Sequence, residues 1–161
     1  MKKLFAMALA AVMMLSLAAC GAKKEEAKDV DLAAFYETIA AEYGWDDNYM
    51  ATLTDDAELM EMYYPGIGSI TTKQLIAKAP AMAVVVNEVV FLQCETEEAA
   101  EEAADILQSR IDMQADGGAW YPESMAAWEK AQVLTEGSYV ALVASAQFQT
   151  EAAELFTAKF A

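Results

Sequence analysis

Acidic side chains at helical spacing are the feature of this sequence that most readily suggests chemistry. The stretch ETEEAAEEAAD, residues 95–105, places Glu97 four residues before Glu101 and Glu98 four residues before Glu102. Carboxylates at this spacing lie about 5–6 Å apart on one helix face, where they can bind Ca²⁺ or share a proton. A helical di-metal site also uses histidine, and the chain has none. We therefore expect a solvated acidic face, with no metal and no cofactor.

Nucleophilic catalysis has little support in the sequence. The chain contains two cysteines, Cys20 and Cys94, and a cysteine or serine nucleophile needs a neighbouring base such as histidine. Cys94 ends the strand-like run VVFLQC, which favours a buried structural thiol. No catalytic residue is predicted. The alternative function is an extracytoplasmic hydrolase or metal-dependent enzyme that uses acidic residues, since paired carboxylates can hydrolyse glycosides.

Aromatic residues beside prolines suggest recognition of a partner. Tyr63 and Tyr64 directly precede one proline, and Trp120 and Tyr121 directly precede another. Tyrosine and tryptophan are enriched at interfaces because they combine a broad apolar body with a polar tip. These four residues are therefore candidates for a surface that binds a protein or a cell-wall partner. The alternative is that their rings cover the core where helices meet a sheet.

The N-terminal segment predicts export and lipid attachment. Lys2 and Lys3 precede an apolar run of about a dozen residues, which is typical of a signal peptide and too short for a transmembrane helix. The run ends in LAAC at Cys20, which resembles a bacterial lipobox. The resemblance implies a lipoprotein signal peptide at residues 1–19 and a diacylglyceryl group on Cys20. Two acyl chains anchor a protein stably, so we expect it on the extracytoplasmic face of the bacterial cell membrane.

Charge and composition limit the partners and the domain organisation. The formal net charge of −16 at pH 7 argues against nucleic acid as a partner, because phosphates require a basic surface. Residues 20–29 are small and charged, and they predict a tether that follows the lipidated cysteine. Residues 30–161 carry ample apolar side chains for a core, and their length predicts a single α+β domain.

Hydrophobic periodicity predicts the helices of this domain. Asp31 and Gly44 have the residue types that begin and end a helix at 32–43. Thr71 and Gln74 form a capping-box pattern, which predicts a short helix beginning at Thr71. A further short helix is expected to begin at residues 54–56 and to end at about Tyr63. The longest helix is expected at 97–114, and two more at 122–130 and 150–160.

Runs of β-branched residues predict two hairpins. The first comprises strands at about 81–86 and 89–94, with Asn87-Glu88 as the turn or bulge between them. The second comprises strands at 131–135 and 138–145 around Glu136-Gly137. Connections this short join antiparallel strands. We therefore expect one small antiparallel sheet of about four strands, with the helices at 32–43, 97–114 and 150–160 packed on it.

The order of these elements resembles a known family. The likeness rests on five short motifs and the lipobox; the motifs are Ala79-Pro80-Ala81-Met82, Asn87-Glu88 before Val89-Val90-Phe91, Gln108-Ser109-Arg110, Trp120-Tyr121-Pro122 and Glu136-Gly137-Ser138-Tyr139-Val140. Over about residues 30–160 the chain resembles the lipoproteins of Gram-positive bacteria catalogued as domain of unknown function 4358. The resemblance implies a single extracytoplasmic α+β domain on a lipid anchor and assigns no activity. Together these features predict a lipid-anchored binding or interaction module of the cell envelope.

Overall fold

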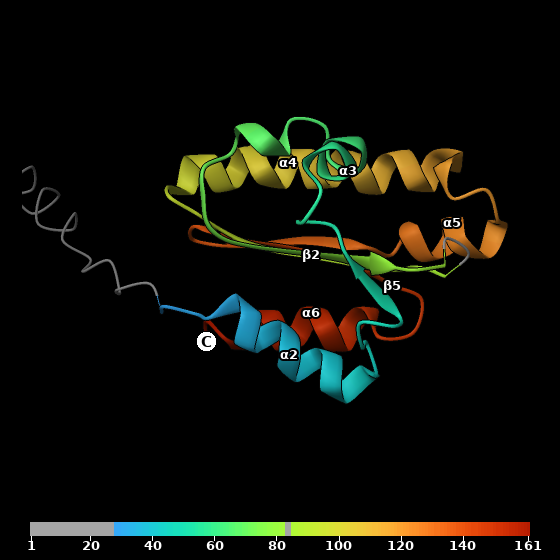
Figure 1. Ribbon diagram of the computed structural model, residues 1–161, viewed down its shortest axis with the longest axis horizontal. Coiled ribbons are helices and arrows are strands. Elements are labelled where there is room, and N and C mark those ends of the chain that lie inside the picture. Colours follow the sequence, from blue (N-terminus) through green and yellow to red (C-terminus); the bar gives the residue numbers. More distant parts are fainter. Residues whose placement is uncertain (1–27, 83–84) are drawn as a thin grey trace, which may run out of the picture.

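A five-stranded antiparallel sheet lies at the centre of the fold, in the order β1-β2-β3-β5-β4 (Figure 1). The computed structural model describes residues 28–82 and 85–161. The strands are β1 (Met50–Thr52), β2 (Thr72–Pro80), β3 (Asn87–Cys94), β4 (Gln132–Glu136) and β5 (Tyr139–Ser145). The predicted α+β class is confirmed, with five strands where about four were expected.

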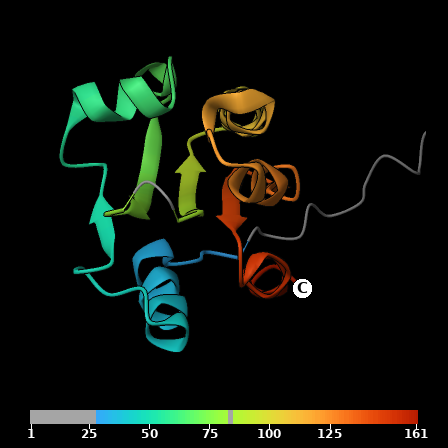
Figure 2. The same cartoon turned by 90° about the vertical axis from the view of Figure 1, so that its right-hand side faces the viewer.

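Helices cover both faces of the sheet (Figure 2). They are α2 (Leu32–Tyr43), α3 (Ala57–Tyr63), α4 (Glu97–Met113), α5 (Pro122–Trp128) and α6 (Gln149–Ala158). Side chains alternate between the two faces along a strand, and the buried β3 divides its residues accordingly. Val89 and Phe91 pack in the core beneath α2 and α6, whereas Val90 and Leu92 pack in the core beneath α3, α4 and α5. The sheet therefore separates two hydrophobic cores.

The predicted helix boundaries agree closely with the structure where local capping decides them. The Asp31 side chain accepts a hydrogen bond from the backbone N–H of Ala34, and Gly44 ends α2 with a φ of 71°. Thr96 caps α4 in the same way, by accepting from the N–H of Ala99. Pro122 begins α5, where its missing N–H costs nothing because the first helical N–H groups have no partner in the helix.

The short helix expected at Thr71 is wrong, because this segment forms β2. Strand β2 pairs with β1 on one side and with β3 on the other, so its backbone groups are satisfied by the sheet. Gln74 does not cap a helix. Its amide joins three parts of the fold, because it accepts from the N–H of Leu32 and donates to Val30 O and to the side chain of Gln93. Pairing with two neighbours outweighs a local capping pattern.

The hairpin expected at 81–94 is also wrong in its first half. Among the described residues of this segment, those of β3 alone form a strand, and the antiparallel neighbour of β3 on that side is β2, at residues 72–80. Asn87-Glu88 is not a turn, since the two residues begin β3 and pair with Ser145 and Ala144 of β5. Both are 3 % exposed. Two polar residues are thus buried at one end of the central strand, one on each face of the sheet.

The two ends of the sheet differ in character. The described chain begins at Lys28, whose ammonium donates a hydrogen bond to the backbone oxygen of the C-terminal Ala161. The C-terminus and the first described residues lie at the left in Figure 1, whereas the end of α2 and the whole of α5 lie at the opposite end. The predicted signal peptide, Cys20 and the tether up to residue 27 are outside the described residues. Within the described ranges, no helix has the length and hydrophobicity needed to cross a membrane.

Candidate functional site

A cleft of about 580 Å³ opens between α3, α4, α5 and the start of β3, at the end of the sheet away from Lys28. Four aromatic side chains contribute to its walls, and its floor holds an arginine and a glutamate. The side chains that define it are Met62, Tyr63, Glu88, Arg110, Trp120, Tyr121 and Trp128. Met62, Trp120 and Tyr121 are among the large apolar side chains that remain exposed. Exposed apolar side chains are therefore concentrated at this cleft.

A buried ion pair forms the floor of the cleft. Arg110 Nε donates to Glu88 Oε1 at 3.0 Å, and Arg110 Nη2 donates to Glu88 Oε2 at 2.8 Å. The hydroxyl of Tyr64 donates to the same Oε1 at 2.9 Å. The side chains of Arg110 and Glu88 are 11 % and 4 % exposed. This bidentate geometry, with a third donor on the carboxylate, offsets the cost of removing both charges from water.

The protonation states of the floor are set by this pairing. Burial raises the pKa of Tyr64 well above its ordinary value, and the charge of Glu88 and its hydrogen bond raise it further. Burial alone would lower the pKa of Arg110, but the hydrogen bonds and charge of Glu88 raise it above the ordinary value. Tyr64 therefore stays neutral and Arg110 stays charged near neutral pH. Neither group is poised to transfer a proton there.

Arg110 also holds the aromatic walls in place. Its guanidinium carbon lies 4.4 Å from the centre of the Tyr63 ring and 5.3 Å from the centre of the Trp128 ring. A guanidinium at these distances attracts the faces of both rings. Since Tyr63 belongs to α3, Trp128 to α5 and Arg110 to α4, one side chain links the three helices around the cleft.

Trp120 stands at the edge of the cleft in a strained conformation. Its φ is +60°, in the left-handed region that a bulky side chain rarely adopts, and its side chain is 87 % exposed. The preceding turn, Gln114–Gly118, has π-helical character and includes Gly117 at a φ of +116°. Strain of this kind persists where the surrounding structure enforces it, and it concentrates at functional positions.

Replacing Trp120 with glycine is expected to stabilise the protein. Glycine adopts positive φ at no steric cost, so Trp120→Gly should raise the free energy of unfolding by about 1 kcal/mol. Trp120→Ala is the matched control, because it removes the same exposed ring but keeps the strained backbone with a Cβ. Urea denaturation of both variants measures the difference. Equal stability of the two variants would show that the backbone at this position is not strained.

The structure brings three of the four predicted aromatic residues together. Tyr63, Trp120 and Tyr121 all line the cleft. Tyr64 needs a correction, because it is 0 % exposed and bonds to Glu88 beneath the surface; it supports the floor and presents no surface to a partner. The alternative of rings covering the core therefore holds for Tyr64.

Sequence reasoning missed the ion pair at the floor. The sequence predicts a turn or bulge at Asn87-Glu88, and Arg110 belongs to a short family motif that assigns it no role. The sequence does contain an indication that Arg110 is special, since it is the single arginine of the chain. It lies seven residues after Ala103 and three after Leu107, a spacing that places it on the inner side of α4. An arginine among buried positions requires a buried acceptor. Nothing local indicates that the acceptor is Glu88.

The acidic run lies away from the cleft. Glu97, Glu98, Glu101 and Glu102 are exposed on α4, and Glu88 is the carboxylate that lines the cleft. No group of three or more acidic, cysteine or histidine side chains in the described part of the chain is arranged to hold a metal ion. Cys94 is buried, and burial raises the pKa of its thiol, which disfavours the reactive thiolate.

Comparison with known proteins identifies a family but no activity. The model of the family described as "Domain of unknown function (DUF4358)" matches residues 43–145, more than half of the chain. The match runs from the end of α2 to the end of β5, so it includes every residue that lines the cleft. No curated protein and no solved structure shows significant similarity to the chain.

Proposed function

The chain belongs to the DUF4358 family, and on that premise we propose that it is a lipid-anchored module of the bacterial cell envelope that binds a protein partner through the aromatic cleft. The lipobox-like sequence at Cys20 supports the anchor and the extracytoplasmic location. The resemblance to Gram-positive lipoproteins supports the same location. No catalytic role is assigned to any residue.

One observation carries the binding function: exposed apolar side chains gather around a cleft whose floor is a buried ion pair. Trp120 is 87 % exposed and Tyr121 is 56 % exposed, and Met62 beside them is 63 % exposed. Tryptophan, tyrosine and methionine are enriched at protein interfaces, and a pocket among them accepts an apolar anchor from the partner. The ion pair of Glu88 and Arg110 keeps that pocket open and ordered before binding, which reduces the entropic cost of association.

The position of the cleft suits a tethered receptor. The first described residues lie at the left in Figure 1, whereas α5, which contributes Ser124 and Trp128 to the cleft, lies at the right. A lipid on Cys20 is separated from Lys28 by a few residues only, so the anchor would hold the opposite end of the domain near the membrane. The cleft would then face away from the bilayer, toward proteins of the envelope.

The acidic charge of the protein favours a partner with basic residues. The chain has a formal net charge of −16, and the exposed Glu61 and Glu123 lie within a few residues of Met62 and Tyr121 in the chain. A partner that presents an apolar anchor flanked by lysine or arginine would be attracted to this end, and its association would slow as salt is raised.

Site-specific crosslinking in cells tests this proposal. A photoreactive amino acid at position 120 should give adducts with a defined protein, because an 87 % exposed side chain can be replaced without disturbing the core. The matched control places the same amino acid at Glu154, an exposed position on α6 on the other face of the sheet. The protein identified should then bind the purified chain, with affinity at least tenfold lower for Trp120→Ala.

Adducts that are equally abundant from positions 120 and 154 would contradict a specific site. Adducts at position 120 that resist proteases and are removed by glycan-degrading enzymes would show that the cleft recognises the cell wall instead of a protein.

A further inference from the structure

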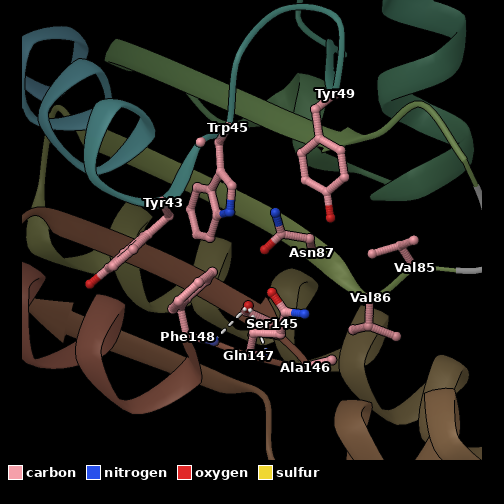
Figure 3. A pocket seen from close by; sticks show the side chains of 11 residues that line it. Tyr43, Trp45, Tyr49, Val85, Val86, Asn87, Ser145, Ala146, Gln147 and Phe148 are labelled. Carbon is pink, nitrogen blue, oxygen red and sulfur yellow. Dashed lines mark hydrogen bonds between the residues drawn. The ribbon is translucent and has the colours of Figure 1, made fainter.

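A second hollow, of about 360 Å³, lies on the other face of the sheet at the same end (Figure 3). Its walls come from the end of α2, the loop before β1 and the loop after β5. The side chains that shape it are Tyr43, Trp45, Tyr49, Asn87, Ser145 and Phe148. It adjoins the aromatic cleft, because Val85, Val86 and Asn87 border both, but its other lining residues are different.

Asn87 has a polar atom without a partner at this hollow. The residue is 3 % exposed, and its Nδ2 donates a weak hydrogen bond to Met50 Sδ at 3.4 Å. Its Oδ1 is buried and accepts no hydrogen bond from the described residues. A buried acceptor without a donor is costly and rare in native proteins, so it calls for an explanation. Figure 3 shows this amide directed into the space between Trp45, Tyr49 and Phe148.

The aromatic walls around Asn87 are well ordered. Tyr43 and Phe148 stack with ring centres 4.3 Å apart and planes inclined by 7°. Trp45 packs against the same pair at an angle, with 5.2 Å between its ring centre and that of Tyr43. Ser145 Oγ accepts hydrogen bonds from the backbone N–H groups of Gln147 and Phe148, which holds the loop that carries Phe148.

Among the described residues, none that lines the hollow carries a charged side chain. Its polar groups are neutral: the amides of Asn87 and Gln147, the hydroxyls of Ser145, Tyr43 and Tyr49, and the indole nitrogen of Trp45. Tyr49 is 37 % exposed, so its ring forms the open wall. An ionic ligand would lack a counter-charge here. A neutral ligand with hydroxyl or amide donors and flat C–H faces would match both the lone acceptor and the rings.

We propose that this hollow binds a neutral sugar unit of a glycan. The C–H face of the sugar packs against Tyr49 and the edge of Trp45, and a hydroxyl or acetamido N–H donates to Asn87 Oδ1. Rotation of the amide about its last torsion, which is soft in asparagine, brings Oδ1 toward the opening. The size of the hollow suits one or two sugar rings, since small-ligand pockets begin at about 300 Å³.

The three tryptophans of the chain report on both hollows in one NMR spectrum. Trp45 lines this hollow, whereas Trp120 and Trp128 line the aromatic cleft. Figure 3 shows the ring nitrogen of Trp45 directed toward Asn87. Titrating ¹⁵N-labelled full-length protein with tetramers of N-acetylglucosamine or of glucose should shift the indole signal of Trp45 in a saturable way and leave those of Trp120 and Trp128 in place.

Asn87→Leu provides the decisive variant, because it removes the acceptor and keeps the branched shape of the side chain. We expect affinity for the sugar to fall at least tenfold while the melting temperature stays the same or rises, since no unpaired acceptor remains buried. Tyr49→Ala, at a partly exposed position, should weaken binding without unfolding. Trp120→Ala should leave sugar binding unchanged, because Trp120 lines the other cleft. Loss of partner binding and loss of sugar binding can therefore be measured separately.

Three results would overturn the proposal. The Trp45 signal could fail to move with either tetramer at millimolar concentration. It could move equally in wild-type protein and Asn87→Leu. It could respond to an uncharged peptide of similar size and to neither sugar, which would assign the hollow to a peptide.

Discussion

Glu88→Ala is expected to lower the free energy of unfolding by about 3–5 kcal/mol, because it leaves the buried guanidinium of Arg110 without its carboxylate. Glu88 accepts both hydrogen bonds that Arg110 donates to it, and a third from Tyr64. Its removal therefore leaves one buried charge and one buried hydroxyl unpaired. A loss of this size is a large fraction of the total stability of a typical domain, about 5–15 kcal/mol. Chemical denaturation monitored by tryptophan fluorescence measures it.

A matched control and a double variant make this prediction specific. Glu101→Ala removes an exposed carboxylate from α4 and should change stability by no more than about 0.5 kcal/mol. Glu88→Leu combined with Arg110→Met replaces the pair with apolar side chains and should recover most of the loss. If Glu88→Ala is no more destabilising than Glu101→Ala, the ion pair does not organise the cleft.

Cys20→Ser is expected to move the protein out of the membrane fraction. The proposed lipid supplies two acyl chains, and each buried CH₂ contributes about 0.8 kcal/mol to membrane binding. The variant should either be released into the medium or accumulate as a precursor that retains residues 1–19. Cell fractionation, with mass spectrometry of the mature N-terminus, distinguishes these outcomes.

Cys94→Ser is the matched control for the anchor. Cys94 is 0 % exposed in the core, so its replacement can lower stability but should leave the protein in the membrane fraction. Wild-type protein that fractionates as soluble, with an unmodified Cys20, would refute the lipid anchor.

Features governed by neighbouring residues in the chain were predictable. The Asp31 and Thr96 caps, the stop at Gly44 and the start at Pro122 depend on hydrogen bonds or backbone torsions within a few residues. The hairpin of β4 and β5 depends on a short turn at Gly137, which has a φ of +60°, between two β-branched runs. These local interactions do not depend on the rest of the fold, so the α+β class could be inferred correctly.

The place of β2 and the burial of Asn87-Glu88 could not be predicted in the same way. The T-x-x-Q pattern at Thr71 favours a helix locally, but β2 is stabilised by pairing along both of its edges, with β1 on one side and β3 on the other. A polar pair between apolar runs favours a turn, because isolated polar groups rarely enter a sheet. Glu88 enters it because Arg110, 22 residues further on, supplies the opposite charge.

By itself, then, the sequence determined every expected helix except the one at Thr71, one hairpin, the fold class and three of the four aromatic residues that could reach a partner. Only the tertiary structure decided that Tyr63, Trp120 and Tyr121 share one cleft, that Tyr64 lies beneath it, and that Asn87 faces a second hollow. The physical reason is the range of the interactions. Caps and turns are satisfied within a few residues, whereas a buried charge or amide is satisfied, or left unsatisfied, by whatever the fold places opposite it.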